Sequence, residues 1–400
     1  MRVFMYCQHV LGIGHLVRSA EIARALSYHS DVTFVSGGAA VSGFPFPPRV
    51  HLVQLLPIKT DEDFGALKNC ETTLNMEELQ DLRRQKLLRL FDILRPDALV
   101  IELFPFGRKR FAFELIPLLE YAQNKSPETL VACSLRDILV EKSDRAKHEA
   151  RVCAIVNAYF DLIMIHGDPC FIKLDETFHR AGNLQCDIRY TGFVQQQEPG
   201  STADADPICP TIVASIGSGR YRQGQLLLEA IVRAAAQLQS RIPHLFQIFA
   251  GPFIPEDVYT RLRLLARGAQ NVEIATYSAH FLYHLKRASL SVSMGGYNTI
   301  MNVLATGVPG LVYPYTANDD QEQHIRAKRL ESLGIVELLH PETLAPDLLA
   351  DKIVRMLAGR QAPFAFDMDG ASNTANILRS AVAARLERVC GATPSDRSAI

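Results

Sequence analysis

The chain is 400 residues long, with 48% hydrophobic and 21% charged residues, so it can form two or three domains whose cores need no disulfides or metals. Its 42 Lys and Arg residues nearly balance its 43 Asp and Glu residues, which argues against a nucleic-acid binder because such proteins usually carry a basic excess. It contains no apolar run long enough to span a membrane, its first residues are too soon polar for a secretory signal, and its eight cysteines lack CxxC spacing. We therefore expect a cytoplasmic multidomain protein without a zinc site or a disulfide framework.

The first half alternates short apolar runs with longer helical patterns. Strands are expected at 2–7, 31–36, 50–55, 98–103, 129–134 and 161–166, and helices at 16–27, 76–94, 111–122 and 143–159. This alternation is typical of βαβ units that build a parallel sheet.

Residues 195–207 contain almost no apolar side chains, which is typical of a linker. The alternation then restarts, with strands at 211–216, 245–250, 272–275, 290–293 and 310–313, and helices at 224–239, 280–287, 297–306 and 321–333. We therefore predict an N-terminal domain at 1–194, a linker at 195–207, a C-terminal domain at 208–370 and a last helix at 371–390.

A glycine turn follows the first strand. Gly12 and Gly14 would let the backbone approach a ligand closely, but Val17 stands where a dinucleotide fingerprint has its third glycine, and the second strand does not end in an acidic residue. His15 begins the next helix, whose dipole disfavours the imidazolium and so suits a neutral general base. The alternative is that His15 only caps the turn.

A second glycine loop, Gly217-Ser218-Gly219, follows the first strand of the second half and precedes a helix. Backbone N–H groups, a hydroxyl and a helix N-terminus together form an anion site. Arg220 and Arg222 could add charge-assisted bonds to a diphosphate. The alternative is a flexible loop with solvated arginines.

Two further loops follow later strands of the second half. Gly295 and Gly296 precede Asn298 and Thr299 at the start of a helix, which again permits close approach and offers polar groups. The third loop contains Asp320, Gln321 and Gln323, whose side chains can form hydrogen bonds with sugar hydroxyls. The alternative is that these residues only cap the helix that follows, as charged residues at a helix start often do. Since all three loops end strands of one parallel sheet, they would share one edge and suit a nucleotide diphosphate sugar.

These motifs resemble the GT-B glycosyltransferases, and within them family 28, the type that forms lipid II by transferring N-acetylglucosamine. The resemblance is carried by Gly12-x-Gly14-His15-x-x-Arg18, Gly217-Ser218-Gly219, Ser293-x-Gly295-Gly296-x-Asn298-Thr299, Ala305-x-Gly307-x-Pro309 and Asp320-Gln321-Glu322-Gln323. It is strong over 210–335 and limited to the first turn in the N-terminal half.

The resemblance implies an α/β protein with two Rossmann-like parallel-sheet domains facing a cleft. The C-terminal domain would hold a nucleotide sugar, usually a UDP sugar such as UDP-GlcNAc, and the N-terminal domain a saccharide, lipid-linked or small-molecule acceptor. Transfer would invert the anomeric centre without a metal or cofactor, and the last helix would cross back onto the N-terminal domain. Asn302 stands where such transferases often carry a Glu that grips the ribose.

The transfer needs a base for the acceptor hydroxyl and positive partial charge for the leaving diphosphate. His15 is the first choice for the base and Glu102, at the end of a strand on the same edge, is the second. Arg136 would line the acceptor side together with Gly12 and Gly14. The donor diphosphate and nucleotide would be bound by Gly217, Ser218, Gly219, Arg220, Arg222, Gly295, Gly296, Asn298, Thr299 and Asn302, and the donor sugar by Asp320, Gln321 and Gln323.

Two other functions share the fold. Non-hydrolysing UDP-sugar epimerases carry carboxylates around the second glycine turn, which this chain lacks, and a non-catalytic nucleotide-sugar-binding subunit would not need the His15 turn. A basic amphipathic stretch at 81–91 is either a solvated helix face or a peripheral contact with a membrane.

Overall fold

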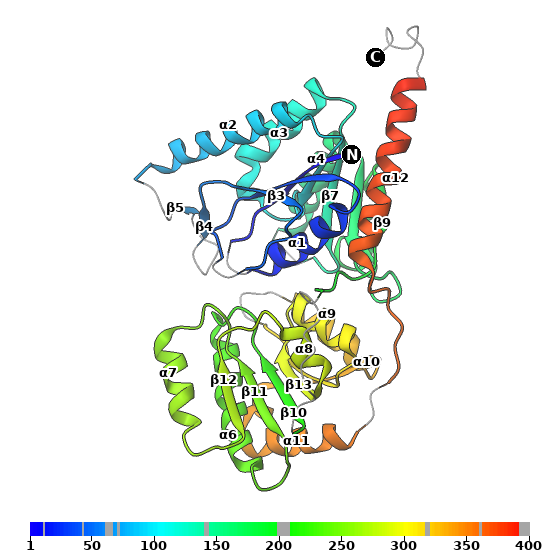
Figure 1. The fold of residues 1–400 in the computed structure, drawn as a ribbon. Coiled ribbons are helices and arrows are strands. Elements are labelled where there is room, and N and C mark those ends of the chain that lie inside the picture. Colours follow the sequence, from blue (N-terminus) through cyan, green and yellow to red (C-terminus); the bar gives the residue numbers. More distant parts are fainter. Residues whose placement is uncertain are drawn as a thin grey trace. The chain divides into compact units, whose positions relative to one another are not determined.

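The structure is a computed structural model that describes residues 1–10, 13–41, 44–60, 67–69, 73–139, 144–197, 209–316, 321–359 and 362–391. The chain divides into two compact units (Figure 1). The N-terminal unit comprises Met1–Val194 with Phe366–Ile400, and the C-terminal unit comprises Gln195–Ala365.

The N-terminal unit is built on a seven-stranded parallel sheet in the order β3-β2-β1-β6-β7-β8-β9. Its strands are β1 (Arg2–Cys7), β2 (Asp31–Ser36), β3 (Val50–Gln54), β6 (Ala98–Glu102), β7 (Leu130–Arg136), β8 (Leu162–His166) and β9 (Asp187–Tyr190). Its helices are α1 (Gly14–Leu26), α2 (Met76–Leu94), α3 (Ala112–Lys125), α4 (Arg145–Tyr159), α5 (Leu174–Thr177) and α12 (Gly370–Gly391), and β4 (Ile58–Thr60) pairs with β5 (Leu67–Asn69).

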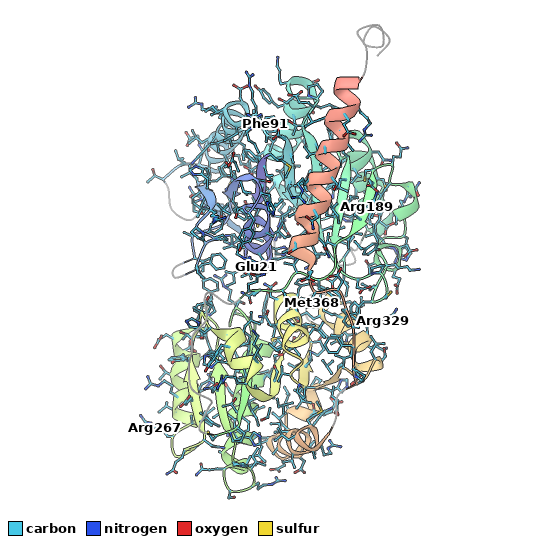
Figure 2. The ribbon with its side chains drawn as sticks, turned by 45° about the vertical axis from the view of Figure 1, so that its right-hand side comes forward. Glu21, Phe91, Arg189, Arg267, Arg329 and Met368 are labelled. Carbon is cyan, nitrogen blue, oxygen red and sulfur yellow. The ribbon has the colours of Figure 1, made fainter. Side chains whose placement is uncertain are left out.

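Both faces of this sheet are buried, because successive side chains of a strand point to opposite faces. On β1, Phe4 and Tyr6 join the core under α2, α3 and α4, whereas Met5 and Cys7 join the core under α1 and α12. The last helix α12 is the segment drawn in red beside α1 in Figure 1, and Met368 in Figure 2 marks the chain just before it.

The C-terminal unit has a six-stranded parallel sheet in the order β12-β11-β10-β13-β14-β15. The strands are β10 (Thr211–Ser215), β11 (Leu245–Phe249), β12 (Val272–Ala275), β13 (Ala288–Met294), β14 (Gly310–Tyr313) and β15 (Val336–Leu338). The helices are α6 (Arg222–Leu238), α7 (Glu256–Leu265), α8 (Phe281–Lys286), α9 (Tyr297–Thr306), α10 (Glu322–Ser332) and α11 (Pro346–Ala358). α6 and α11 pack on one face, and α8 and α9 on the other.

The strand order of both sheets reverses beside the first strand, between β1 and β6 in one unit and between β10 and β13 in the other. In open α/β sheets, ligands bind at the carboxyl ends of the strands where this reversal occurs. The topology therefore points to one candidate site in each unit.

The predicted α/β fold with two parallel sheets is confirmed, and most predicted elements lie within two or three residues of their observed ends. The sequence analysis missed β9, β15, α5, α7, α11 and the β4–β5 pair. In α2, one cation of the predicted basic face is buried: Arg83 is 1% exposed and its guanidinium pairs with Glu114 at 2.7 Å. Among the described residues, none of the helices has both the length and the apolar character needed to cross a membrane.

Replacing Leu378 tests the packing of α12 on the N-terminal unit. Leu378 is fully buried, so Leu378→Ala should lower the free energy of unfolding of that unit by about 2–5 kcal/mol, the usual cost of emptying a core site. Leu386→Ala on the same helix should change it by about 0.5 kcal/mol or less, because Leu386 is 41% exposed. Urea unfolding curves measure both variants, and equal effects would show that α12 does not bury Leu378 in solution.

Candidate active site

The candidate site of the N-terminal unit lies where its strand order reverses. β1 is followed along the chain by α1, and the adjacent strand β6 ends at Glu102. Gly12 lies outside the described residues, and Gly14 is the first residue of α1. Because the carboxyl ends of parallel strands meet at one edge, the start of α1 and the end of β6 come together there.

His15 and Glu102 form a hydrogen-bonded pair at this edge. His15 Nδ1 lies 2.6 Å from Glu102 Oε1, the carboxylate is fully buried, and 21% of the His15 side chain is exposed. Burial lowers the pKa of His15 to about 4, although the neighbouring carboxylate raises it. His15 is therefore neutral near pH 7.

Glu102 stays ionised although it is buried. Burial raises the pKa of its carboxyl, but His15, Arg18 and Arg108 together outweigh burial and lower that pKa to about 2. Arg18 contributes directly, since its guanidinium nitrogen lies 2.7 Å from Oε1. It is three residues after His15 on α1, so both side chains reach the same carboxylate from one helix face.

The ionised carboxylate determines which nitrogen of His15 carries the proton. A carboxylate only accepts hydrogen bonds, so the Nδ1–H of neutral His15 donates to Glu102 and Nε2 keeps its lone pair. Nε2 has no hydrogen bond to any described residue. This arrangement can accept a proton from a hydroxyl group, and the buried anion then stabilises the imidazolium.

A hydrogen-bonded cluster of His166, Ser134 and Thr191 joins the next two strands, β7 and β8. His166 Nε2 lies 2.7 Å from Ser134 Oγ, and Nδ1 lies 3.0 Å from Thr191 Oγ1. Burial lowers the pKa of His166 to about 3, so it is uncharged. Ser134 is the register partner of Glu102, and the group thereby holds the ends of β7 and β8 in place beside the pair.

Two further arginines, Arg136 and Arg108, lie at this edge of the sheet. Arg136 is the last residue of β7 and partly exposed. Arg108 follows β6 in the loop to α3 and interacts electrostatically with both Glu102 and Arg136. The sequence analysis chose Arg136 for the acceptor side and overlooked Arg108 and the site role of Arg18, although Arg18 stands in the quoted motif.

The site of the C-terminal unit begins with the loop after β10. Gly217 and Gly219 have φ of +67° and +85°, which strains any residue other than glycine. The loop packs closely on the turn after β11: a Cβ on Gly251 would lie 2.4 Å from the Gly219 nitrogen, and the Ser218 carbonyl accepts from the Phe253 N–H at 2.9 Å. The backbone of the predicted diphosphate loop is thus held in one conformation.

The two arginines of this loop have different surroundings. The Arg220 guanidinium lies 4.8 Å from the centre of the Phe253 ring, a cation–π distance. Arg222 is the first residue of α6 and is exposed.

The turn after β13 lies at the same edge, because Ser215 of β10 is in register with Ser293. Gly296 precedes α9 and has open space where a Cβ would be. Arg326 of α10, fully buried, donates to the Gly295 carbonyl at 3.3 Å and pairs with Glu322 at 2.7 Å. Arg326 therefore holds the turn in place from inside the unit. The sequence analysis did not select this residue.

The remaining residues that were predicted to bind the sugar nucleotide differ in their exposure and in their contacts. Asn298 and Thr299 are partly exposed in the first turn of α9, whereas Asn302 is 2% exposed and its amide donates to Gln196 at 2.8 Å. Gln321 is exposed, and the Gln323 side chain accepts from the Tyr315 N–H at 3.0 Å. Asp320 lies outside the described residues.

Comparison with known proteins identifies the family of the C-terminal domain. The model of the glycosyltransferase family 28 C-terminal domain matches residues 222–382. An uncharacterized glycosyltransferase of Methanosarcina acetivorans is 23% identical over 395 residues, 92% of this chain and 93% of that protein. This chain is a GT-B glycosyltransferase with a family 28 C-terminal domain.

A second relative of this GT-B protein carries a functional name. The UDP-N-acetylglucosamine--N-acetylmuramyl-(pentapeptide) pyrophosphoryl-undecaprenol N-acetylglucosamine transferase of Methylorubrum extorquens is 27% identical over 196 residues, 48% of this chain. The match spans about half, 51%, of that relative's length.

Solved structures share the GT-B fold over nearly the whole chain. The calicheamicin glycosyltransferase CalG4 has a TM-score of 0.58 at 16% identity, covering 97% of this chain and 98% of that chain. The UDP-GlcNAc 2-epimerase of Methanocaldococcus jannaschii also has a TM-score of 0.58, at 11% identity, covering 95% and 99%. At these identities the likeness shows the fold alone.

An NMR titration of the His15 imidazole tests the electrostatics of the pair. The midpoint should lie near pH 4, because burial disfavours the imidazolium. In Glu102→Gln the midpoint should be lower still, since the lost carboxylate is the neighbour that raises the pKa. A midpoint near 6.5 in the unaltered protein, or a rise in the variant, would contradict this account.

Proposed function

We propose that this protein transfers a sugar from a nucleotide diphosphate sugar to an acceptor hydroxyl, with inversion at the anomeric carbon and without a metal ion. The observation that carries the proposal is the neutral His15, whose Nδ1 is bound to an ionised, buried Glu102 at the strand reversal of the N-terminal unit. The acceptor would bind to this unit and the donor to the C-terminal unit.

In the proposed reaction, the acceptor hydroxyl donates its proton to His15 Nε2 as its oxygen bonds to the anomeric carbon. The bond from that carbon to the diphosphate breaks, and its electron pair leaves with the nucleoside diphosphate. Glu102 stabilises the imidazolium that forms and keeps the ring in its orientation. Arg18 keeps Glu102 ionised and is a positioning residue.

On the donor side, the loop of Gly217, Ser218 and Gly219 and the turn of Gly295 and Gly296 would bind the diphosphate. They lie at the ends of neighbouring strands, and the helix N-termini of α6 and α9 place positive partial charge there. This charge can neutralise the leaving diphosphate, which is the task that a metal ion performs in other transferases.

The other donor contacts are assigned to residues of the same unit. Arg220, Arg222, Asn298 and Thr299 would add polar contacts to the nucleotide and diphosphate. We propose a UDP sugar as the donor, with a ribose contact from Asn302 that exchanges its bond to Gln196 for one to the nucleotide. The donor sugar would be held by Asp320, Gln321 and Gln323.

Incubation with a panel of UDP, TDP and GDP sugars and mixed acceptors tests the proposal. Release of nucleoside diphosphate that depends on an acceptor supports a transferase. An isomerised sugar nucleotide would instead indicate an epimerase, whose fold this chain shares, and binding without turnover would indicate a non-catalytic subunit.

The role of His15 as base predicts a loss of rate without a loss of donor affinity. His15→Ala should lower kcat by about 10²- to 10⁴-fold, the usual contribution of a positioned base, and should leave KM for the donor nearly unchanged because the donor loops belong to the other unit. His29→Ala, at an exposed histidine, is the matched control and should keep full activity. If kcat survives in His15→Ala while Glu102→Gln abolishes it, the base is Glu102.

The open space at Gly296 predicts a binding defect without a folding defect. Gly296 has φ −62° and ψ 145°, which any residue adopts, and a Cβ there would meet nothing within 4 Å. Gly296→Val should therefore keep its melting temperature but lower affinity for the donor nucleotide about tenfold or more, because the added side chain occupies the space above the turn. Gly182→Ala, which is equally unobstructed in the N-terminal unit, is the control. Unchanged affinity in calorimetric titrations of Gly296→Val would remove this turn from the donor site.

A further inference from the structure

We propose that Arg108 is the centre of a subsite for an anionic group, a phosphate or a carboxylate, on the molecule that binds beside His15. The subsite is formed at the carboxyl edge of the N-terminal sheet by Arg108 with Arg136 and Arg18 around Glu102. Naming this molecule as the acceptor rests on the proposed function; the binding of an anion does not.

Positively charged side chains gather at this edge of the sheet. The guanidinium groups of Arg18 and Arg108 both act on Glu102, whose Oε1 already binds His15 and Arg18, and Arg136 acts electrostatically on Arg108. His15 is uncharged near pH 7 because burial lowers its pKa to about 4. Glu102 is the carboxylate with the largest effect on the Arg108 guanidinium, but its Oε1 is already bound by His15 and Arg18.

Arg108 is the arginine of this group with unused hydrogen-bond donors. Its side chain makes no hydrogen bond or close ion pair with any described residue, and its Nε is buried without a hydrogen-bond partner. Burial disfavours its charge and lowers the pKa of its guanidinium. A partly desolvated guanidinium with unused donors is costly to keep, and an anionic ligand would offset that cost with charge-assisted bonds.

Glu102 shows that the edge is also prepared for a hydrogen-bond donor. Its Oε2 is buried and has no hydrogen-bond partner among the described residues, while Oε1 is fully engaged. A ligand that presents an anion to Arg108 and a hydroxyl next to the carboxylate would satisfy both groups. A sugar with a phosphate or a carboxylate has this combination.

The loop that carries Arg108 is held rigidly. The Leu103 N–H donates to the Ser134 carbonyl, and the Gly107 N–H donates to the Leu103 carbonyl. Phe104, Phe106 and Phe111 are buried in the core on both sides of Arg108. The guanidinium is therefore placed by packed neighbours and does not depend on a mobile loop for its position.

Hydrogen exchange of the full chain at pH 7 tests the subsite without turnover. The probes are inorganic phosphate and D-glucuronate, with D-glucose as the neutral control. Either anion should slow exchange in peptides covering 103–111, whereas glucose should not. Because exchange is measured in the peptides that cover 103–111, protection there is distinguished from phosphate binding at the glycine turns of the other unit.

Variants of neighbouring arginines identify the residue responsible. Arg108→Gln should weaken anion binding, read from the same peptides, by about 10- to 100-fold, the worth of hydrogen bonds to a charged group. Arg110→Gln removes an exposed charge two residues away and should leave it unchanged. Protection by phosphate alone or by glucuronate alone identifies the group that the subsite selects.

Several results would overturn the proposal: no protection by either anion, equal protection by glucose, or equal effects of the two variants. If Arg108 serves only to neutralise Glu102, Arg108→Gln will shift the His15 titration and leave anion binding intact, which also refutes the subsite. Failure of every nucleotide sugar to turn over while the loop is protected would refute the transferase function and leave the subsite standing.

Discussion

The buried carboxylate of Glu102 is the constraint around which the N-terminal unit is organised. An ionised carboxylate in a protein interior is unfavourable unless it is paired and hydrogen-bonded, and here α1 supplies both partners from one face, His15 and Arg18. The pairing ties β6 to the helix that follows β1, so the position of the candidate base depends on the register of these two strands. Removing the charge would affect fold and chemistry together.

A buried ion pair also stabilises the candidate site of the C-terminal unit. Arg326 is buried under the turn after β13, where it binds Glu322 and the Gly295 carbonyl. Two adjacent glycines would by themselves leave this turn flexible. The hydrogen bond from Arg326 to the Gly295 carbonyl restricts the turn to one conformation. Both units thus have a buried ion pair at the edge of the sheet that carries the candidate site.

The sequence could predict which residues share an edge but not how they pair. His15 follows the parallel strand β1 and Glu102 ends the adjacent strand β6, so the two residues lie at one edge of the sheet. Alternating sequence patterns revealed both strands. That Arg18 reaches the same carboxylate, that His166 joins Ser134 and that Arg326 lies below Gly295 depend on side-chain packing that no short-range pattern encodes. The missed strand β15 has three residues, too few for a clear periodicity, and α11 follows a short helical turn at Pro341–Leu344 that obscures its start.

The low basicity of His15 gives the anionic subsite a chemical consequence. A general base works best when its pKa lies near the working pH, and a pKa of about 4 is well below that range. After burial, the groups that lower this pKa are Arg108 and Arg18. An anion bound to Arg108 would offset their positive charge and raise the pKa of His15, by the same physical effect through which Glu102 already raises it. A charged acceptor would then strengthen the base that deprotonates its own hydroxyl, whereas a neutral acceptor would meet a weaker base.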